Sequence, residues 1–157
     1  MIVVADTTPL NYLILIDEVE LLPALFGHVL IPSAVFEELS NVRTPSEVRR
    51  WMEHLPEWLE VRNVSTITNP VLNNLDPGER EAIQLALDLS IQIVLIDEAE
   101  GRHVAEMLHL QVRGTLGILA RGAELGKTDL RLVFDKLQQT SFRLSPSVRD
   151  AFLKRIP

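Results

Sequence analysis

The chain has 157 residues, 46% of them hydrophobic, which predicts one domain spanning residues 1–157 with a well-filled core. It contains no Cys, so disulfides, thiolate catalysis, iron–sulfur clusters and Cys-based zinc sites are excluded, and its 4 His residues form no HExxH motif. The net charge is −7, which at first argues against a nucleic-acid partner, because phosphate binding normally needs a basic surface.

The distribution of the charge weakens that objection. Residues 1–100 carry 5 Lys or Arg and 17 Asp or Glu, whereas residues 101–157 carry 10 Lys or Arg and 5 Asp or Glu. An acidic centre beside a basic flank fits a metal site with an adjoining phosphate track. It fits equally an acidic protein with a solvated basic helix.

Short apolar runs alternate with helical patterns along the chain, which predicts βαβ units and a doubly wound α/β fold. Strands are expected at residues 2–5, 28–31, 59–62, 91–96 and 110–113. Helices are expected at residues 8–15, 17–26, 33–40, 45–54, 77–89, 98–108, 115–125, 129–139 and 146–155, with Pro32, Pro45, Pro77 and Pro146 in first turns. The polar stretch 65–74 is expected to be a mobile loop.

Apolar runs interrupted by charges never reach the length of a membrane-spanning helix, and the N-terminus lacks a signal-peptide pattern. We therefore expect a cytoplasmic protein without a membrane partner.

Two carboxylates follow apolar strands directly. Asp6 ends the first strand and Asp97 ends the fourth, and each precedes a helix. Because parallel open sheets bind ligands at the carboxyl ends of their strands, both side chains should lie at the same edge. Each residue alone could instead be the N-cap of the helix that follows it.

Two further acids lie in predicted helices. Glu38, next to Leu39, belongs to the helix that follows the second strand and can reach along the rim toward the cleft, and Glu79 lies in the acidic first turn of the helix at 77–89. In isolation, Glu38 could belong to a solvated face, and Asp76 with Glu79 has the spacing of a capping pair. If all four acids converge, their mutual repulsion requires a divalent cation, and oxygen-only ligands select Mg²⁺ or Mn²⁺. Such an ion can orient a scissile phosphate and stabilise the leaving oxygen.

The chain resembles the PIN-domain ribonucleases, specifically their toxin-like (VapC-type) branch. The resemblance covers residues 1 to about 125 and rests on the order and spacing of several short motifs. These motifs are Val4-Ala5-Asp6-Thr7-Thr8-Pro9-Leu10, Ile31-Pro32 through Glu38-Leu39, Gly78-Glu79 with Ala82-Ile83 and Leu85-Ala86, Ile96-Asp97-Glu98 with Gly101-Arg102 and Ala105, and Gly114-Thr115-Leu116-Gly117-Ile118-Leu119. The resemblance implies a PIN-like sandwich with a five-stranded parallel sheet flanked by helices, acidic ligands for Mg²⁺ or Mn²⁺, and endoribonuclease activity.

The resemblance also implies site residues. The acids that match the family by position are Asp6, Glu38, Glu79 and Asp97. Glu98 competes with Asp97 for the last place, and Glu81 is a weaker rival to Glu79. A Glu at the third position, where many PIN domains have Asp, departs from the family pattern and leaves the affinity for metal open. The polar residues expected to orient substrate are Thr7, Asn11 and Thr115.

Partners follow from the resemblance alone. It implies an RNA substrate, a homodimer, and a small antitoxin protein whose helix can block the site. Residues 128–157 predict two amphipathic terminal helices. The basic residues of this tail either guide RNA or are solvated charges: Arg131, Lys136, Arg143, Arg149, Lys154 and Arg155.

Three other functions use similar acids. A catalytically inactive PIN-like binding module would keep them for capping or metal-dependent stability, and a structure-specific nuclease would use them on DNA. A phosphotransfer domain also places acids at strand ends, but it normally needs a Lys after the last strand. This chain has none there until Lys127.

Overall fold

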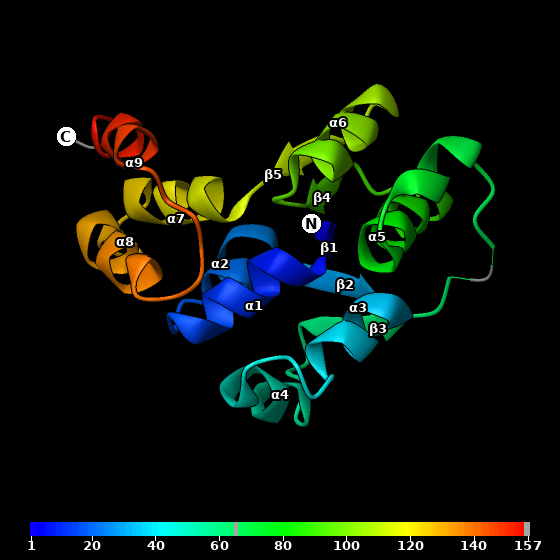
Figure 1. The fold of residues 1–157 in the computed structure, drawn as a ribbon, viewed down its shortest axis with the longest axis horizontal. Coiled ribbons are helices and arrows are strands. Elements are labelled where there is room, and N and C mark those ends of the chain that lie inside the picture. The colour runs from blue at the N-terminus through cyan, green and yellow to red at the C-terminus, as the bar shows by residue number, and fades with distance from the viewer. Residues whose placement is uncertain (65, 156–157) are drawn as a thin grey trace.

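The computed structural model describes residues 1–64 and 66–155, and its centre is a parallel sheet (Figure 1). The strands are β1 (Ile2–Ala5), β2 (His28–Pro32), β3 (Leu59–Arg62), β4 (Ile93–Leu95) and β5 (Gln111–Arg113). All pairings are parallel, in the order β3-β2-β1-β4-β5. The predicted five-stranded, doubly wound sheet is therefore confirmed, with β1 and β4 adjacent where the strand order reverses.

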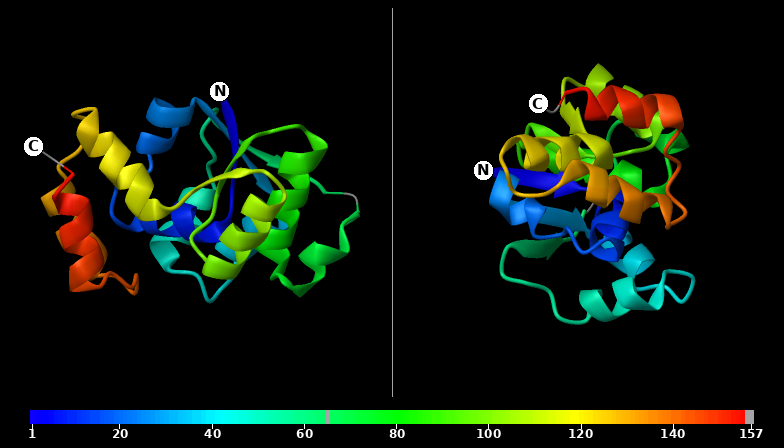
Figure 2. Two further views of the ribbon diagram at one scale, coloured as in Figure 1. Left: turned by 90° about the horizontal axis from the view of Figure 1, so that it is seen from above. Right: turned by 90° about the vertical axis from the view of Figure 1, so that its left-hand side faces the viewer.

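Helices cover both faces of this sheet. They are α1 (Thr7–Leu15), α2 (Leu21–Phe26), α3 (Ser33–Leu39), α4 (Ser46–Met52), α5 (Pro77–Asp88), α6 (Ala99–Met107), α7 (Thr115–Glu124), α8 (Leu130–Gln138) and α9 (Pro146–Leu153). Figure 2 shows the terminal helices α8 and α9 at the opposite end of the molecule from α5.

Alternation along the strands divides the apolar residues into two cores, because successive side chains point to opposite faces. Val3 and Ala5 of β1 belong to the larger core, packed with residues of α1, α2, α3, α4, α7 and α8. Val4 of the same strand belongs to the smaller core, packed with α5 and α6. Every strand position of β1 between Val3 and Ala5 is fully buried.

The structure corrects several predicted boundaries. The helix expected at 17–26 begins only at Leu21, because Asp17 has a φ of 60°, which a right-handed helix does not allow. Part of the expected loop at 65–74 is a short 3₁₀ helix, η1 (Pro70–Asn74), which the Asn69 side chain caps through the Val71 N–H. Ser65 lies outside the described residues.

The prolines in predicted first turns fall into two groups. Pro77 and Pro146 begin α5 and α9, as predicted, whereas Pro32 and Pro45 occupy the cap positions immediately before α3 and α4. Among the described residues, none of the helices combines the length and apolar character required to cross a bilayer.

Backbone hydrogen bonds join the strand ends that carry the predicted site. The N–H of Asp6 donates to the carbonyl of Leu95 at 2.9 Å, and the N–H of Ile96 donates to the carbonyl of Arg113 at 3.0 Å. The register aligns Ala5 with Leu95. The residues that follow β1 and β4 therefore emerge together at the carboxyl edge of the sheet.

Candidate functional site

Asp6 lies at the centre of this edge and is buried, with only 3% of its surface exposed. It occupies the cap position before α1, but its side chain makes no capping hydrogen bond. Burial, together with smaller contributions from the carboxylates of Asp76, Glu38 and Asp97, raises the pKa of Asp6 to about 7. The capping alternative therefore does not account for Asp6, which is a buried acid among other acids.

Asp97 is held by the start of α7. The backbone N–H of Thr115 donates to one Asp97 carboxylate oxygen at 2.8 Å, and the Thr115 hydroxyl donates to the other at 2.6 Å. Burial raises the pKa of Asp97, while Thr115 and Arg102 lower it. Asp97 does not cap α6, whose cap position is Glu98. Thr115 is fully buried, so it fixes the carboxylate rather than facing solvent.

Glu79 shows how capping and burial combine at the start of α5. Asp76 is the cap, because its carboxylate accepts the N–H of Glu79 at 2.9 Å. The Glu79 side chain is buried, with 5% exposed, and burial together with the nearby Asp76 raises its pKa to about 8. Asp6 and Glu98 make smaller contributions to the same rise. The capping pair predicted from spacing is thus half right: Asp76 caps, and Glu79 joins the acidic cluster.

Glu38 reaches the cluster from α3. It is exposed, and the Thr7 hydroxyl donates to its carboxylate at 2.8 Å. Thr7, which directly follows Asp6 in the sequence, therefore positions the Glu38 carboxylate. Asn11, one turn further along α1, lines a hollow of about 690 Å³ together with Thr7 and Glu38.

The remaining acids differ in their surroundings. The carboxylate of Glu81 accepts the N–H of Ala34 at 3.2 Å, so it serves the first turn of α3. Glu98 is exposed and lines another hollow together with Asp97. Compared with Glu98, Asp97 is the more buried, and its carboxylate is held by two hydrogen bonds from Thr115.

Three glycines, to which sequence reasoning gave no role, leave room for the carboxylates. A Cβ on Gly78 would lie 2.9 Å from an Asp6 carboxylate oxygen and 3.3 Å from one of Glu38. A Cβ on Gly101 would lie 3.0 Å from a Glu79 carboxylate oxygen, and one on Gly114 would lie 2.9 Å from an oxygen of Asp97. The signal was present in the motifs, where Gly78 and Gly114 directly precede Glu79 and Thr115.

Arg102 lowers the pKa of Asp97, but no ion pair neutralises the four acids within the described residues. The ion pairs found there involve none of Asp6, Glu38, Glu79 or Asp97. Among the same residues, no three Asp, Glu or His side chains already stand in an arrangement that would hold a metal ion. Asp6, Glu79 and Asp97 nevertheless lie in one neighbourhood, each with a raised pKa, and all four acids offer oxygen donors only.

Comparison with known families identifies this arrangement. A family model described as a PIN domain matches residues 2–157. The chain belongs to the PIN-domain family. The match continues through the two terminal helices, beyond residue 125, where the resemblance seen in the sequence ends. No significant match was found among curated proteins or among solved structures.

PIN domains are generally nucleases, which are hydrolases, and they typically use divalent metals. The position of the acids at the carboxyl edge of the sheet agrees with that assignment, because this is where open parallel sheets place their ligands. Membership of the VapC-type branch remains a prediction.

Proposed function

We propose that this PIN domain is a Mg²⁺- or Mn²⁺-dependent endoribonuclease that hydrolyses RNA phosphodiester bonds. The observation that carries the proposal is the convergence of Asp6, Glu38, Glu79 and Asp97 from four separate segments, without a cation to pair with them in the described residues. Gathering carboxylates away from water is costly unless a divalent cation neutralises them. The pKa values of Asp6 and Glu79 are raised because burial and the neighbouring acids disfavour their charged forms.

The donor set fits a hard divalent cation. Asp6, Glu79 and Asp97 are the acids that would hold it, with Glu38 and Glu98 at the exposed rim. All of them offer oxygen ligands, which suit Mg²⁺ and Mn²⁺. When bound, the ion would neutralise the acids, orient the scissile phosphate and stabilise the leaving oxygen.

The protein's own residues would prepare this site. Thr115 holds both oxygens of Asp97 and so fixes its orientation, and Thr7 does the same for one oxygen of Glu38. Loss of such supporting hydrogen bonds typically lowers the metal affinity roughly 10- to 100-fold. Asn11 and Thr7 face the hollow beside Glu38, where they could contact the substrate.

We further propose that the protein is the toxin of a toxin–antitoxin pair, acts in the cytoplasm and forms a homodimer. The support is the resemblance of its motifs to the VapC-type branch. Co-expression with the product of the neighbouring gene tests the pairing: an antitoxin should relieve growth inhibition and co-purify, whereas a chain without effect on growth contradicts the toxin role.

The nuclease itself is tested on a mixed pool of structured and single-stranded RNA, with Mg²⁺, Mn²⁺ or EDTA. Wild type is compared with Asp6→Asn, Asp97→Asn and a matched control, Asp150→Asn, which changes an exposed aspartate on α9. Cutting that requires metal, is lost in the first two variants and persists in the control supports the proposal.

Two other outcomes would favour a different function. Metal-dependent cutting of single-stranded or branched DNA, with RNA left intact, would indicate a structure-specific DNA nuclease. Failure to cut any substrate, with an intact fold, would favour a catalytically inactive binding module.

A further inference from the structure

The connection between α8 and α9, residues 139–145, folds back onto α1 beside the acidic cluster. The hydroxyl groups of Tyr12 and Ser141 lie 2.8 Å apart, within hydrogen-bond distance. The rings of Tyr12 and Phe142 meet edge to face, with centroids 5.0 Å apart and planes at 85°. The Phe142 N–H also donates to the Thr140 hydroxyl at 3.2 Å. This connection is therefore held against α1 by specific contacts.

A hollow of about 490 Å³ lies between this connection and the acids. Tyr12, Phe142 and Arg143 line it together with Asp97 and Glu98. The two aromatic side chains are half-buried, and Arg143 is exposed. An aromatic pair and an arginine thus adjoin the predicted position of the scissile bond.

Arg143 does not serve to neutralise those acids. In the described part of the chain it forms no ion pair, and Arg102 is the cation that lowers the pKa of Asp97. Other arginines of the tail are engaged elsewhere. Arg149 pairs with Asp135 at 2.8 Å, and Arg155 lies over the ring of Phe152. Arg143 shares a hollow with Asp97 and Glu98 of the acidic cluster.

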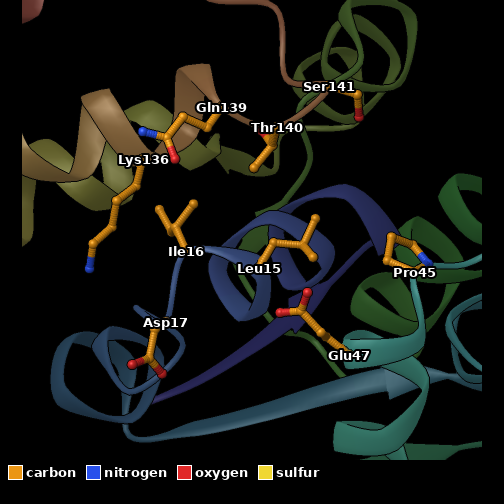
Figure 3. A pocket seen from close by; sticks show the side chains of 9 residues that line it. All are labelled: Leu15, Ile16, Asp17, Pro45, Glu47, Lys136, Gln139, Thr140 and Ser141. Atoms are coloured by element: carbon orange, nitrogen blue, oxygen red, sulfur yellow. The ribbon is translucent and has the colours of Figure 1, made fainter.

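Further hollows continue this surface around α1. The one of about 690 Å³ beside Glu38 also contains Tyr12 and adds Arg43. A third, of about 480 Å³, shares Ser141 with the first and Pro45 with the second. Figure 3 shows this third hollow, with Thr140 and Gln139 facing Leu15 and Ile16 at the end of α1. The acids therefore stand beside a concave path with an arginine on either side.

We propose that Tyr12, Phe142 and Arg143 form a nucleotide-binding subsite for single-stranded RNA next to the cleavage position. The inference rests on the proposed ribonuclease function. Aromatic side chains hold single-stranded RNA by stacking on its bases, and an arginine beside them binds a phosphate through its fork of donors. A base within a duplex is already stacked on its neighbours, so this subsite requires an unpaired nucleotide.

The test measures binding of a short unstructured RNA to the full chain carrying Asp6→Asn, which slows cutting, in the presence of Mg²⁺. Phe142→Leu removes the aromatic face but keeps an apolar side chain, Phe142→Tyr restores the ring, and Arg143→Ala removes the cation. The matched control is Arg121→Ala, since Arg121 lines a hollow with Met1 at the opposite edge of the sheet. Thermal unfolding of each variant verifies that it is folded.

Phe142→Leu should weaken binding roughly tenfold or more, the effect of losing one base-stacking contact, and Phe142→Tyr should not. Arg143→Ala should reduce the slope of log K against log salt concentration by about 1, the effect of losing one phosphate contact. The fluorescence of a 2-aminopurine placed next to the cleavage position should be quenched when the RNA binds the Asp6→Asn protein. It should not be quenched when the RNA binds the protein that also carries Phe142→Leu. Binding of duplex RNA should not change in either variant.

The failures can be distinguished. If the wild-type protein cuts RNA while Phe142→Leu and Arg143→Ala bind and cut as well as Arg121→Ala does, the subsite is refuted and the proposed function stands. If the wild type neither binds nor cuts any RNA with Mg²⁺ or Mn²⁺, the proposed function is refuted and the subsite with it.

Discussion

Replacing Asp6 by Asn should stabilise the metal-free protein, and the gain should increase with pH. The carboxyl group is 3% exposed, and its pKa in the folded chain is about 7, compared with an ordinary value of 3.8. Asn has nearly the same shape and never carries the charge. A variant that damages the metal site would thus gain stability, as expected where an active site is strained for function.

The sign and magnitude follow from proton linkage. Below pH 3.8 Asp6 is protonated in both the folded and the unfolded chain, so it contributes nothing. Between pH 3.8 and about 7 only the unfolded chain releases the proton, so the wild type loses stability steadily as the pH rises, and above pH 7 the loss is complete. At about 1.4 kcal/mol for each tenfold change in proton affinity, the full loss is at most roughly 4 kcal/mol.

The assay is thermal unfolding in EDTA between pH 4.5 and 8.5, for wild type, Asp6→Asn and the exposed control Asp150→Asn. For a chain of this size about 1 kcal/mol shifts Tm by roughly 2–4 °C. Asp6→Asn should therefore gain several degrees over wild type at pH 8 and little at pH 4.5. A difference between Asp6→Asn and wild type that is the same at both ends of the pH range would refute the argument, because a packing effect does not depend on pH.

Other variants and conditions probe the same site. Mg²⁺ or Mn²⁺ should raise the Tm of the wild type more at pH 8 than at pH 6, since metal ligands must lose their protons, and equal shifts would contradict ligation by acids of raised pKa. Thr115→Val keeps the shape but removes the hydroxyl bond to Asp97, so the Mn²⁺ affinity measured by titration calorimetry should fall roughly 10- to 100-fold. Gly78→Ala should destabilise the fold by about 1–3 kcal/mol in urea unfolding, because its Cβ would lie 2.9 Å from Asp6. Gly117→Ala, inside α7, should instead stabilise the fold by up to about 1 kcal/mol, because its Cβ would have no neighbour within 4 Å apart from the adjacent residues and the backbone of its own helix. A similar sign for both variants would rule out the crowding argument.

The sequence by itself determined the five strands, with ends that differ by one or two residues in β2, β4 and β5, and the edge at which Asp6 and Asp97 meet. Apolar runs that end in a carboxylate and lead into a helix recur at both residues, and a parallel sheet brings the carboxyl ends of its strands to one edge. The strand order of the structure then placed β1 beside β4. These features depend on local patterns and on a small number of allowed topologies.

Only the tertiary structure decided which acids are caps and which are not. Asp6, Asp76 and Asp97 look alike in sequence, because each precedes a helix. In the fold Asp76 alone uses its side chain as a cap, whereas Asp97 bonds to Thr115, 18 residues later. The burial that raises the pKa values of Asp6 and Glu79 also comes from segments distant in the sequence, so no local pattern reveals it.

The proposed subsite of Tyr12, Phe142 and Arg143 is a further feature that no local sequence pattern reveals. The hydroxyl groups of Tyr12 and Ser141 meet across 129 positions of sequence, and the ring of Phe142 follows. The charge pattern of residues 128–157 was compatible both with RNA contacts and with solvated helices. Whether an arginine of this tail lies beside the acids depends on how α8 and α9 pack against the body. Such packing is a property of the whole chain, because it balances buried surface contributed by many elements at once.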